Sequence, residues 1–143
     1  MTTSAEQMEH GYRADFAATR FMVVDDFGTM RRIVSGLVRE LGGEHVIEAE
    51  DGVDALKKLA HHDVDFIISD WNMPHMTGLE LLKSLRADRR SADIPFLLVT
   101  AEARKENIVE AARAGADGYI VKPFSSNVLG EKIVNVLKRR SQQ

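Results

Sequence analysis

The sequence contains no cysteine among its 143 residues. This absence excludes disulfide bonds, a thiol nucleophile and a zinc site built on thiolates. Long apolar runs are also missing, since none approaches the roughly 18–20 residues that a membrane span needs. The first 20 residues lack the apolar core of a secretory signal peptide. We therefore expect a cytoplasmic protein that does not act at a membrane.

A large excess of positive charge is absent as well, because the formal net charge at pH 7 is -3. This balance argues against nonspecific binding to nucleic acid. The basic run Lys138 to Arg140 is expected to offset the dipole of a final helix. The hydrophobic fraction of 44% and the charged fraction of 29% are typical of a single globular domain. No exposed apolar stripe is predicted, so we expect a monomer.

Apolar strand-like runs alternate with amphipathic helical runs from residue 20 onward. The third apolar run, VDFIISD, is of the continuous kind that is buried on both faces of a sheet. In the first helical run, Ile33, Leu37 and Leu41 have the spacing of an apolar face. The alternation predicts an α/β fold with a five-stranded parallel sheet, five helices and right-handed crossovers. The expected strands are 20–26, 45–49, 64–70, 94–100 and 118–122, and the expected helices are 30–41, 52–61, 79–88, 105–114 and 126–139.

The same pattern predicts the domain boundaries. Residues 20–140 form the expected globular domain, and residues 141–143 form a short C-terminal tail. Residues 1–19 form a polar N-terminal extension, which we expect to be flexible or weakly helical and tolerant of substitution.

Four of the five expected strands end in a distinctive polar side chain. Asp25 and Asp26 end the first strand, Asp70 the third, Thr100 the fourth and Lys122 the fifth. In an open parallel sheet, ligands bind beyond the carboxyl ends of the strands, near the switch point in strand order. If the first and third strands are neighbours there, three carboxylates converge and need a compensating cation. Oxygen ligands without histidine or cysteine favour Mg²⁺ or Mn²⁺, and Lys122 and Thr100 can contact a phosphoryl oxygen beside the ion.

Each of these residues also has an ordinary structural interpretation. An aspartate after a strand commonly caps a turn or a helix. A lysine before proline is usually exposed, and a threonine at the end of a strand often caps the next element. Their joint occurrence at four strand ends favours a binding site over these separate interpretations.

The chain contains the segments VVDDFGTMRRIV, AEDGVDAL, ISDWNMPHMTGLELL, VTAEARKENI and GYIVKPF. Together they closely resemble the receiver domain of bacterial response regulators, and within that family the stand-alone chemotaxis regulators. The resemblance covers residues 20–140, almost the whole chain. It implies a flavodoxin-like, doubly wound sheet with the strand order 2-1-3-4-5.

The resemblance also implies the roles of the acidic residues. Asp70 would be the phosphoacceptor, and Asp25, Asp26 and Asp70 would hold Mg²⁺ or Mn²⁺ with the backbone carbonyl of Asn72. Asn72 and Glu102 would tune dephosphorylation by controlling the approach of water. Glu102 can equally be an exposed acid that is favoured at a helix start. The protein would be a phosphoacceptor switch that assists its own phosphorylation and dephosphorylation, and not an enzyme with a separate substrate.

Three further residues would connect the phosphoryl group to the rest of the domain. Lys122 would contact the phosphoryl group, and Thr100 would bond to it once it has formed. Tyr119 would be a rotamer switch that turns inward when Thr100 moves, although a half-buried core tyrosine is the alternative interpretation. The resemblance also implies a cis bond between Lys122 and Pro123.

The resemblance places the output surface on the fourth helix, the fifth strand and the fifth helix. An exposed Ile108 beside Lys105 would suit docking of a short amphipathic peptide. The implied partners are a chemotaxis histidine kinase as the donor and the flagellar motor switch protein as the target. Whether a dedicated phosphatase acts on the protein stays open. The matching surface residues are Lys105, Ile108, Tyr119, Val121 and Lys132.

Three hypotheses about function stay open at this point. The first is a phosphorylation-activated switch of the flagellar motor, and the second is a receiver that serves another two-component pathway as a phosphate sink or adaptor. The third is a flavin carrier or an aspartyl-phosphate phosphatase on a similar sheet. A flavin phosphate would be repelled by two carboxylates after the first strand. Such a phosphatase usually carries its nucleophile on the first strand, whereas the candidate here, Asp70, ends the third.

Overall fold

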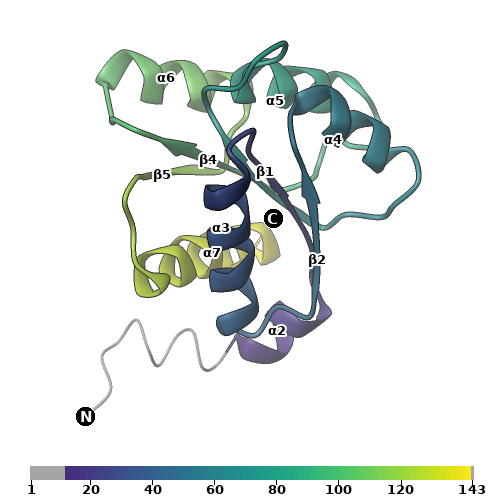
Figure 1. Cartoon of the computed structure of the whole chain (residues 1–143), viewed down its shortest axis with the longest axis vertical. Helices are drawn as coiled ribbons and strands as arrows, with labels where there is room; N and C mark the ends of the chain where they lie inside the picture. Colours follow the sequence, from purple (N-terminus) through teal and green to yellow (C-terminus); the bar gives the residue numbers. More distant parts are fainter. Residues whose placement is uncertain (1–11, 143) are drawn as a thin grey trace.

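The chain folds around one parallel β-sheet with helices on both faces (Figure 1). The structure, a computed structural model, describes residues 12–142. Within these residues the order of strands is β2-β1-β3-β4-β5, and every neighbouring pair is parallel. The predicted fold class and strand order are therefore confirmed. The strands are β1 Arg20–Val24, β2 His45–Ala49, β3 Phe66–Asp70, β4 Phe96–Thr100 and β5 Gly118–Val121.

Helices α3 and α7 cover one face of the sheet, and α4, α5 and α6 cover the other (Figure 1). These five helices correspond to the five predicted ones, and α2 is additional. None of the helices within residues 12–142 is long and apolar enough to cross a membrane. The helices in this part of the chain are α2 Arg13–Ala18, α3 Gly28–Glu40, α4 Gly52–Leu59, α5 Gly78–Ala87, α6 Lys105–Ala114 and α7 Ser126–Ser141.

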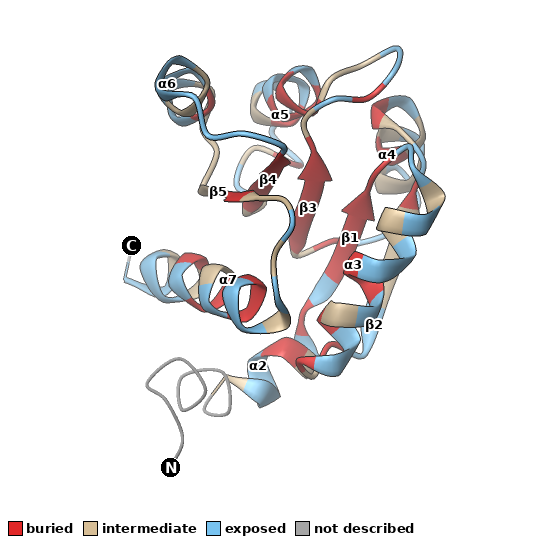
Figure 2. Ribbon diagram, turned by 60° about the vertical axis from the view of Figure 1, so that its left-hand side comes forward, coloured by how far each residue is buried: buried red, intermediate tan, exposed pale blue. Residues whose placement is uncertain are grey.

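Alternate residues along each strand supply two separate hydrophobic layers, which appear as buried ribbon in Figure 2. In β1, Phe21 and Val23 belong to the layer beneath α3 and α7, whereas Met22 and Val24 belong to the layer beneath α4 and α5. Strands β3 and β4 are buried along their whole length, which explains their continuous apolar sequences. The sheet is thus a rigid platform for the side chains that follow its strands.

Most helices that begin at the carboxyl edge of the sheet have a side-chain cap. Asp51 caps α4, and Ser125 caps α7. Thr77 and Glu80 form a reciprocal capping box at the start of α5. Helices α3 and α6 differ, because Phe27 and Arg104 occupy their N-cap positions and no side-chain cap bond is found at either among the described residues. The turn that leads into α3 must therefore be fixed by other contacts.

Helix α2 departs from the polar extension that the sequence predicts. Phe16 is 0% exposed and packs edge-on against Phe21, with 6.2 Å between ring centroids. Arg13 lies against Gly42, which follows α3 with a left-handed φ of 117°. In Figure 2, α2 lies beneath the amino ends of the strands. Helix α2 is therefore attached to the core through Phe16. The rest of the expected extension, residues 1–11, and the last tail residue lie outside the described residues.

The buried face of α3 also differs from the prediction. Ile33 is 51% exposed, whereas Val34 and Val38 are buried beside the sheet. Leu37 is half-buried and Leu41 is buried. The prediction was wrong for Ile33 because two apolar faces, offset by one residue, fit this part of the sequence equally well. One residue corresponds to a rotation of about 100° around the helix axis.

Candidate functional site

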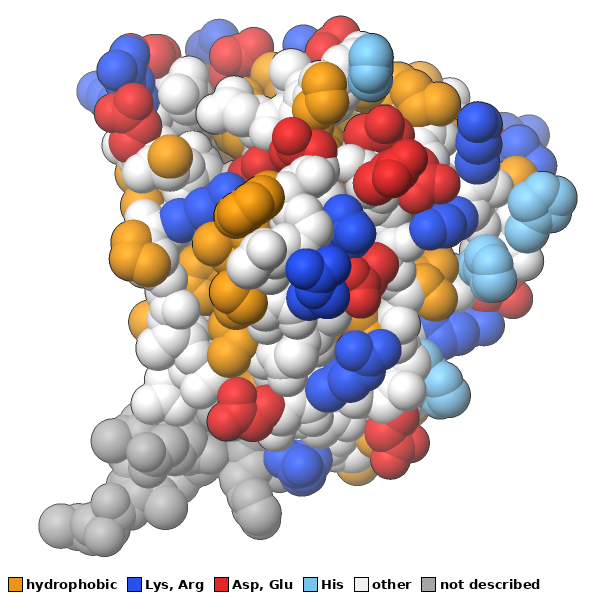
Figure 3. Space-filling view, viewed as in Figure 1, with side chains coloured by type: hydrophobic (Ala, Val, Ile, Leu, Met, Phe, Trp, Pro, Cys, Tyr) orange, Lys and Arg blue, Asp and Glu red, His pale blue; other side chains and the backbone are white. Residues whose placement is uncertain are grey.

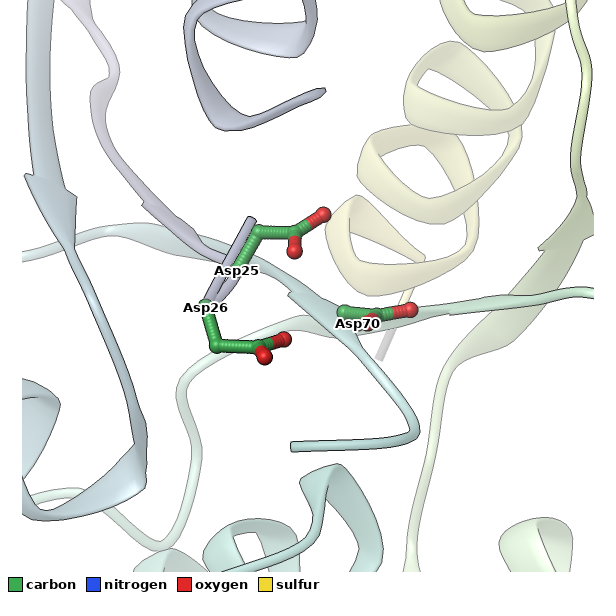
Figure 4. Close-up of side chains that lie close together, drawn as sticks. All are labelled: Asp25, Asp26 and Asp70. Atoms are coloured by element: carbon green, nitrogen blue, oxygen red, sulfur yellow. The ribbon is translucent and has the colours of Figure 1, made fainter. Parts of the chain in front are cut away.

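Three carboxylates meet at the carboxyl edge of the sheet (Figure 4). Asp25 and Asp26 directly follow β1, and Asp70 is the last residue of β3. These strands are adjacent, and the chain order across the sheet reverses between them. One oxygen from each carboxylate lies within 4.8 Å of the others. The predicted convergence of the three aspartates is therefore confirmed.

The three carboxylates differ in their surroundings. Asp25 is 3% exposed and Asp70 is 7% exposed, whereas Asp26 is exposed. Burial raises the pKa of Asp25 and of Asp70, and repulsion from neighbouring carboxylates raises both further. The backbone N–H of Phe27 donates to Asp25 Oδ1 at 2.9 Å and partly offsets this effect. A cation would relieve the repulsion, and the all-oxygen donor set suits Mg²⁺ or Mn²⁺.

Lys122 supplies positive charge to this cluster. It directly follows β5, and its backbone N–H donates to the Thr100 carbonyl at 2.8 Å, which fixes its position beside β4. Its Nζ lies 3.0 Å from Asp70 Oδ1. Burial raises the pKa of Asp70, and the ion pair with Lys122 lowers it. The bond to Pro123 is cis, as the resemblance implies.

Thr100 ends β4 and follows Val99, the residue paired with Asp70 in the sheet. Its hydroxyl donates to the Glu102 carbonyl at 3.0 Å and accepts a longer bond, 3.4 Å, from the Glu102 N–H. The Glu102 side chain is exposed and forms an ion pair with Arg104 at 3.2 Å. The Thr100 hydroxyl is therefore engaged with the loop after β4.

Tyr119 lies in β5, opposite Leu98 of β4. Side chains alternate along a strand, so Thr100, two residues after Leu98, lies on the same face of the sheet as Tyr119. Tyr119 is half-buried against the layer beneath α4, α5 and α6. The Nζ of Lys132 lies 5.4 Å from the centroid of its ring, at a cation–π distance. This placement is compatible with both a switch and a structural tyrosine, so the switch role stays a prediction.

The loop after Asp70 is held close to the sheet. The N–H of Gly78 donates to the Trp71 carbonyl at 2.8 Å. A Cβ atom at Gly78 would overlap the carbonyl oxygen of Asp70, so the first residue of α5 has to be glycine. Asn72 is exposed between these points, and the ligand role of its carbonyl stays a prediction.

The predicted output residues lie on α6, β5 and α7. Lys105 begins α6 and is exposed. Ile108 is half-buried, so the expectation of an exposed isoleucine was wrong, and Val109 is exposed in its place. Ile108 lies three residues before the buried Ala111 and so shares the inner face of the helix. The other members of the set are half-buried: Tyr119, Val121 and Lys132.

Arg31 contacts the acidic turn and is held by Glu48, although the sequence analysis did not single out either residue. Arg31, in the first turn of α3, donates through Nη1 to the Asp25 carbonyl at 2.8 Å. Its Nε donates to Glu48 Oε1 of β2 at 3.0 Å. In Figure 3, Asp and Glu side chains gather in the upper part of the visible face, with Lys and Arg side chains next to them. No local spacing signals the contact, because Arg31 and Glu48 lie 17 residues apart on different elements.

A second charged cluster lies at the opposite, amino edge of the sheet. Asp117 immediately precedes β5, and its carboxylate accepts hydrogen bonds from Arg140 at 2.8 and 3.0 Å. The same carboxylate accepts from Arg86 at 3.2 Å and from the Phe96 N–H at 2.8 Å. The basic run at the end of α7 therefore anchors the helix as well as facing its dipole.

Comparison with known proteins agrees with this geometry. The family model for the response regulator receiver domain matches residues 21–134. The chain is 51% identical over 120 residues to the chemotaxis protein CheY of Pseudomonas aeruginosa, which covers 84% of this chain and 97% of that protein. CheY-3 of Vibrio cholerae is also 51% identical over 120 residues, covering 84% of this chain and 92% of that protein.

Solved structures extend the same comparison to the fold. CheY4 of Vibrio cholerae has a TM-score of 0.73 at 36% identity and covers 85% of this chain and 97% of its own. The receiver domain of a Francisella response regulator has a TM-score of 0.75 at 32% identity and covers 86% of this chain and 98% of its own. The chain therefore belongs to the response regulator receiver family, whose general mechanism is phosphorylation of an aspartate, and it is closely related to the CheY chemotaxis regulators.

Proposed function

We propose that this protein is a phosphorylation-activated chemotaxis response regulator that accepts a phosphoryl group on Asp70. The observation that carries the proposal is the buried Asp70 carboxylate, which lies 3.0 Å from the Lys122 ammonium inside a cluster of three carboxylates. The similarity to CheY proteins supports the assignment to chemotaxis. The donor would be a chemotaxis histidine kinase.

The donor atoms of the cluster fit a divalent cation. The carboxylates of Asp25, Asp26 and Asp70 would hold Mg²⁺ with the backbone carbonyl of Asn72, and Mn²⁺ has the same preference for oxygen. When bound, the ion would supply positive charge to the oxygens of the phosphoryl group. The three carboxylates alone would repel an anionic phosphoryl donor.

Phosphoryl transfer requires Asp70 to attack phosphorus in line with the bond that breaks. An Asp70 carboxylate oxygen forms the new P–O bond while the P–N bond of a phosphohistidine breaks, and its electron pair goes to the imidazole nitrogen. Lys122 pairs with Oδ1 of Asp70, which leaves Oδ2 for the attack. The flexible stem of Lys122 then lets its ammonium follow the charge onto the phosphoryl oxygens.

The phosphoryl group would change the bonding of Thr100. Phosphorylation replaces one negative charge by about two and adds strong acceptor oxygens. The Thr100 hydroxyl would exchange its bond to the Glu102 carbonyl for a stronger, charge-assisted bond to the phosphoryl group. Its movement opens space on the face shared with Tyr119, whose ring can turn inward and away from Lys132. The exposed Asn72 and Glu102 would control the access of water to the acyl phosphate.

The signal would leave the domain through α6, β5 and α7. Lys105 and Lys132 provide positive charge, and Ile108, Tyr119 and Val121 provide half-buried apolar surface. This combination suits a short amphipathic peptide with acidic groups, and we propose the flagellar motor switch protein as its source. The protein would act as a monomer in the cytoplasm and would hydrolyse its own acyl phosphate with or without a dedicated phosphatase.

A first experiment tests the phosphoacceptor site. Trp71 is the only tryptophan of the chain and follows Asp70 directly, so its fluorescence can report binding. We expect a saturable response to Mg²⁺ and a further change on addition of acetyl phosphate. Asp70→Asn should abolish the second change. If the folded wild-type protein responds to neither addition, the proposed function is wrong.

A second experiment separates motor control from the role of a phosphate sink or adaptor. A peptide from the N-terminus of a flagellar motor switch protein is titrated into the protein with and without a phosphoryl mimic. Motor control predicts that the mimic strengthens peptide binding and that Lys132→Ala weakens it. Equal binding in both states would favour the sink or adaptor, since that alternative shares the site and differs only at the target surface.

A further inference from the structure

Arg31 connects three elements around the turn that carries Asp25 and Asp26. It lies in the first turn of α3, and its side chain is 19% exposed. Its guanidinium donates to the Asp25 carbonyl at 2.8 Å and to Glu48 Oε1 at 3.0 Å. A planar guanidinium that serves two acceptors at once has little freedom to rotate. Arg31 is therefore placed to fix the position of the Asp25 backbone.

The Asp25 turn is held at several of its polar atoms. The Asp25 N–H donates to the Ala49 carbonyl at 3.1 Å and continues the pairing of β1 with β2. Asp25 Oδ1 accepts from the Phe27 N–H, and the Asp25 carbonyl accepts from Arg31. Helices α4, α5 and α7 each begin with a side-chain cap, whereas α3 and α6 within the described chain do not. Arg31 thus stabilises from inside α3 the turn before the helix, which in α4, α5 and α7 is stabilised by a side-chain cap.

Glu48 holds Arg31 in this orientation. It lies in β2 opposite Val23 of β1, on the strand next to the acidic turn. The carbonyl of the same residue accepts from Lys58 Nζ, which also pairs with Asp54 of α4 at 3.2 Å. The Glu48 carboxylate balances the charge of Arg31, so the main effect of the guanidinium is on geometry and not on net charge. The contact thereby couples the acidic turn to β2 and α4.

We propose that Arg31 is a positioning residue for the divalent-cation site, which it controls by holding the main chain of Asp25. This inference rests on the proposed function, because it assumes that the three carboxylates bind a cation. Residues that orient metal ligands typically change metal affinity by about 10–100-fold when they are lost. Within residues 12–142 Arg31 donates to the Asp25 carbonyl and to Glu48 but not to the carboxylates of Asp25, Asp26 or Asp70, so its effect would pass through the backbone.

The chain offers a matched control at the next position. Arg32 has the same chemistry and lies on the same helix turn, but its side chain is exposed. Replacing Arg32 therefore removes one positive charge near the site without removing the bond to the Asp25 carbonyl. Asp117→Ala is the control for lost stability, because it removes an ion-pair cluster at the opposite edge of the sheet.

The test is a calorimetric titration of the full-length protein with Mg²⁺, with folding checked by near-UV circular dichroism. We expect Arg31→Ala to weaken Mg²⁺ binding about tenfold. Arg31→Lys should recover part of the loss, because an ammonium can donate to one of the two acceptors but cannot reproduce the two-pronged geometry of the guanidinium. Arg32→Ala and Asp117→Ala should bind Mg²⁺ within twofold of the wild type.

The outcomes separate this inference from the function on which it rests. If the wild type binds Mg²⁺ and Arg31→Ala binds it equally well, the positioning role is wrong and the proposed function stands. An equal loss in Arg32→Ala would show that charge alone matters, and an equal loss in Asp117→Ala would show that lost stability explains the effect. Either result overturns the role of Arg31. If the folded wild type does not bind Mg²⁺, the proposed function fails first.

Discussion

Replacing Phe16 by alanine is expected to lower the free energy of unfolding by about 3–5 kcal/mol, the usual cost for a fully buried phenylalanine. The ring is 0% exposed, belongs to the layer beneath α3 and α7, and packs edge-on against Phe21. Such an aromatic pair contributes about 0.5–1.5 kcal/mol of that total. For a domain of this size, the melting temperature should fall by roughly 6–20 °C. Total stabilities are about 5–15 kcal/mol, so the variant should still fold.

Urea unfolding followed by circular dichroism measures this change, and Phe27→Ala is the matched control. Phe27 is 61% exposed, so its replacement should change the free energy of unfolding by no more than about 0.5 kcal/mol. The m value should stay the same for both variants. A loss below about 1 kcal/mol for Phe16→Ala would refute the reasoning, because α2 would then not be part of the core.

Three other substitutions have expected outcomes in the same assay. Burial raises the pKa of Asp25 above its unfolded value, so wild-type stability falls as pH rises from the unfolded pKa to the folded pKa. Asp25→Asn should therefore be more stable than the wild type at pH 7 in chelator. This advantage should shrink below about pH 4. Asp117→Ala should lose about 3 kcal/mol, since it leaves partly buried arginines without their partner. Gly78→Ala should lose at least about 1–3 kcal/mol and also weaken Mg²⁺ binding, because its methyl group would displace the Asp70 backbone.

Asp117→Ala and Gly78→Ala each have a control within the chain. Asp63 forms an exposed ion pair with Arg20, so Asp63→Ala should cost less than about 1 kcal/mol. A Cβ at Gly36 meets nothing within 4 Å in the middle of α3, so Gly36→Ala should stabilise the protein by about 1 kcal/mol. Asp25→Asn needs no second variant, because the same protein is compared at two pH values. A stabilising Gly78→Ala, a neutral Asp117→Ala, or a destabilised Asp25→Asn at pH 7 would each contradict its prediction.

The strands and the acidic cluster could be predicted because each has a local signature in the sequence. Strands β3 and β4 are buried on both faces and therefore read as continuous apolar runs. Asp25, Asp70 and Lys122 directly follow or end such runs, and parallel strands bring these ends to one edge. The strand order itself came from the resemblance, because no local pattern distinguishes one neighbour of β1 from another.

The contacts that the sequence did not predict depend on tertiary packing. Phe16 lies in a short polar segment and becomes a core residue only because the fold packs it against Phe21 of β1. Ile33 and Val34 have similar side chains, so the sequence could not decide which one faces the sheet. Arg31 and Asp117 find their partners on other elements, at separations that carry no periodic signal.

The anchored end of α7 offers a defined place for attaching a probe. Arg140 binds the Asp117 carboxylate, and Arg139 donates to the Asp117 carbonyl at 2.6 Å, so the last turn is fixed at the amino edge of the sheet. The acidic cluster and Trp71 lie at the other edge. A single cysteine in place of Ser141 would be the only thiol in the chain. A dye coupled there would be attached to a fixed helix end, at the edge of the sheet opposite the indole and the acidic cluster.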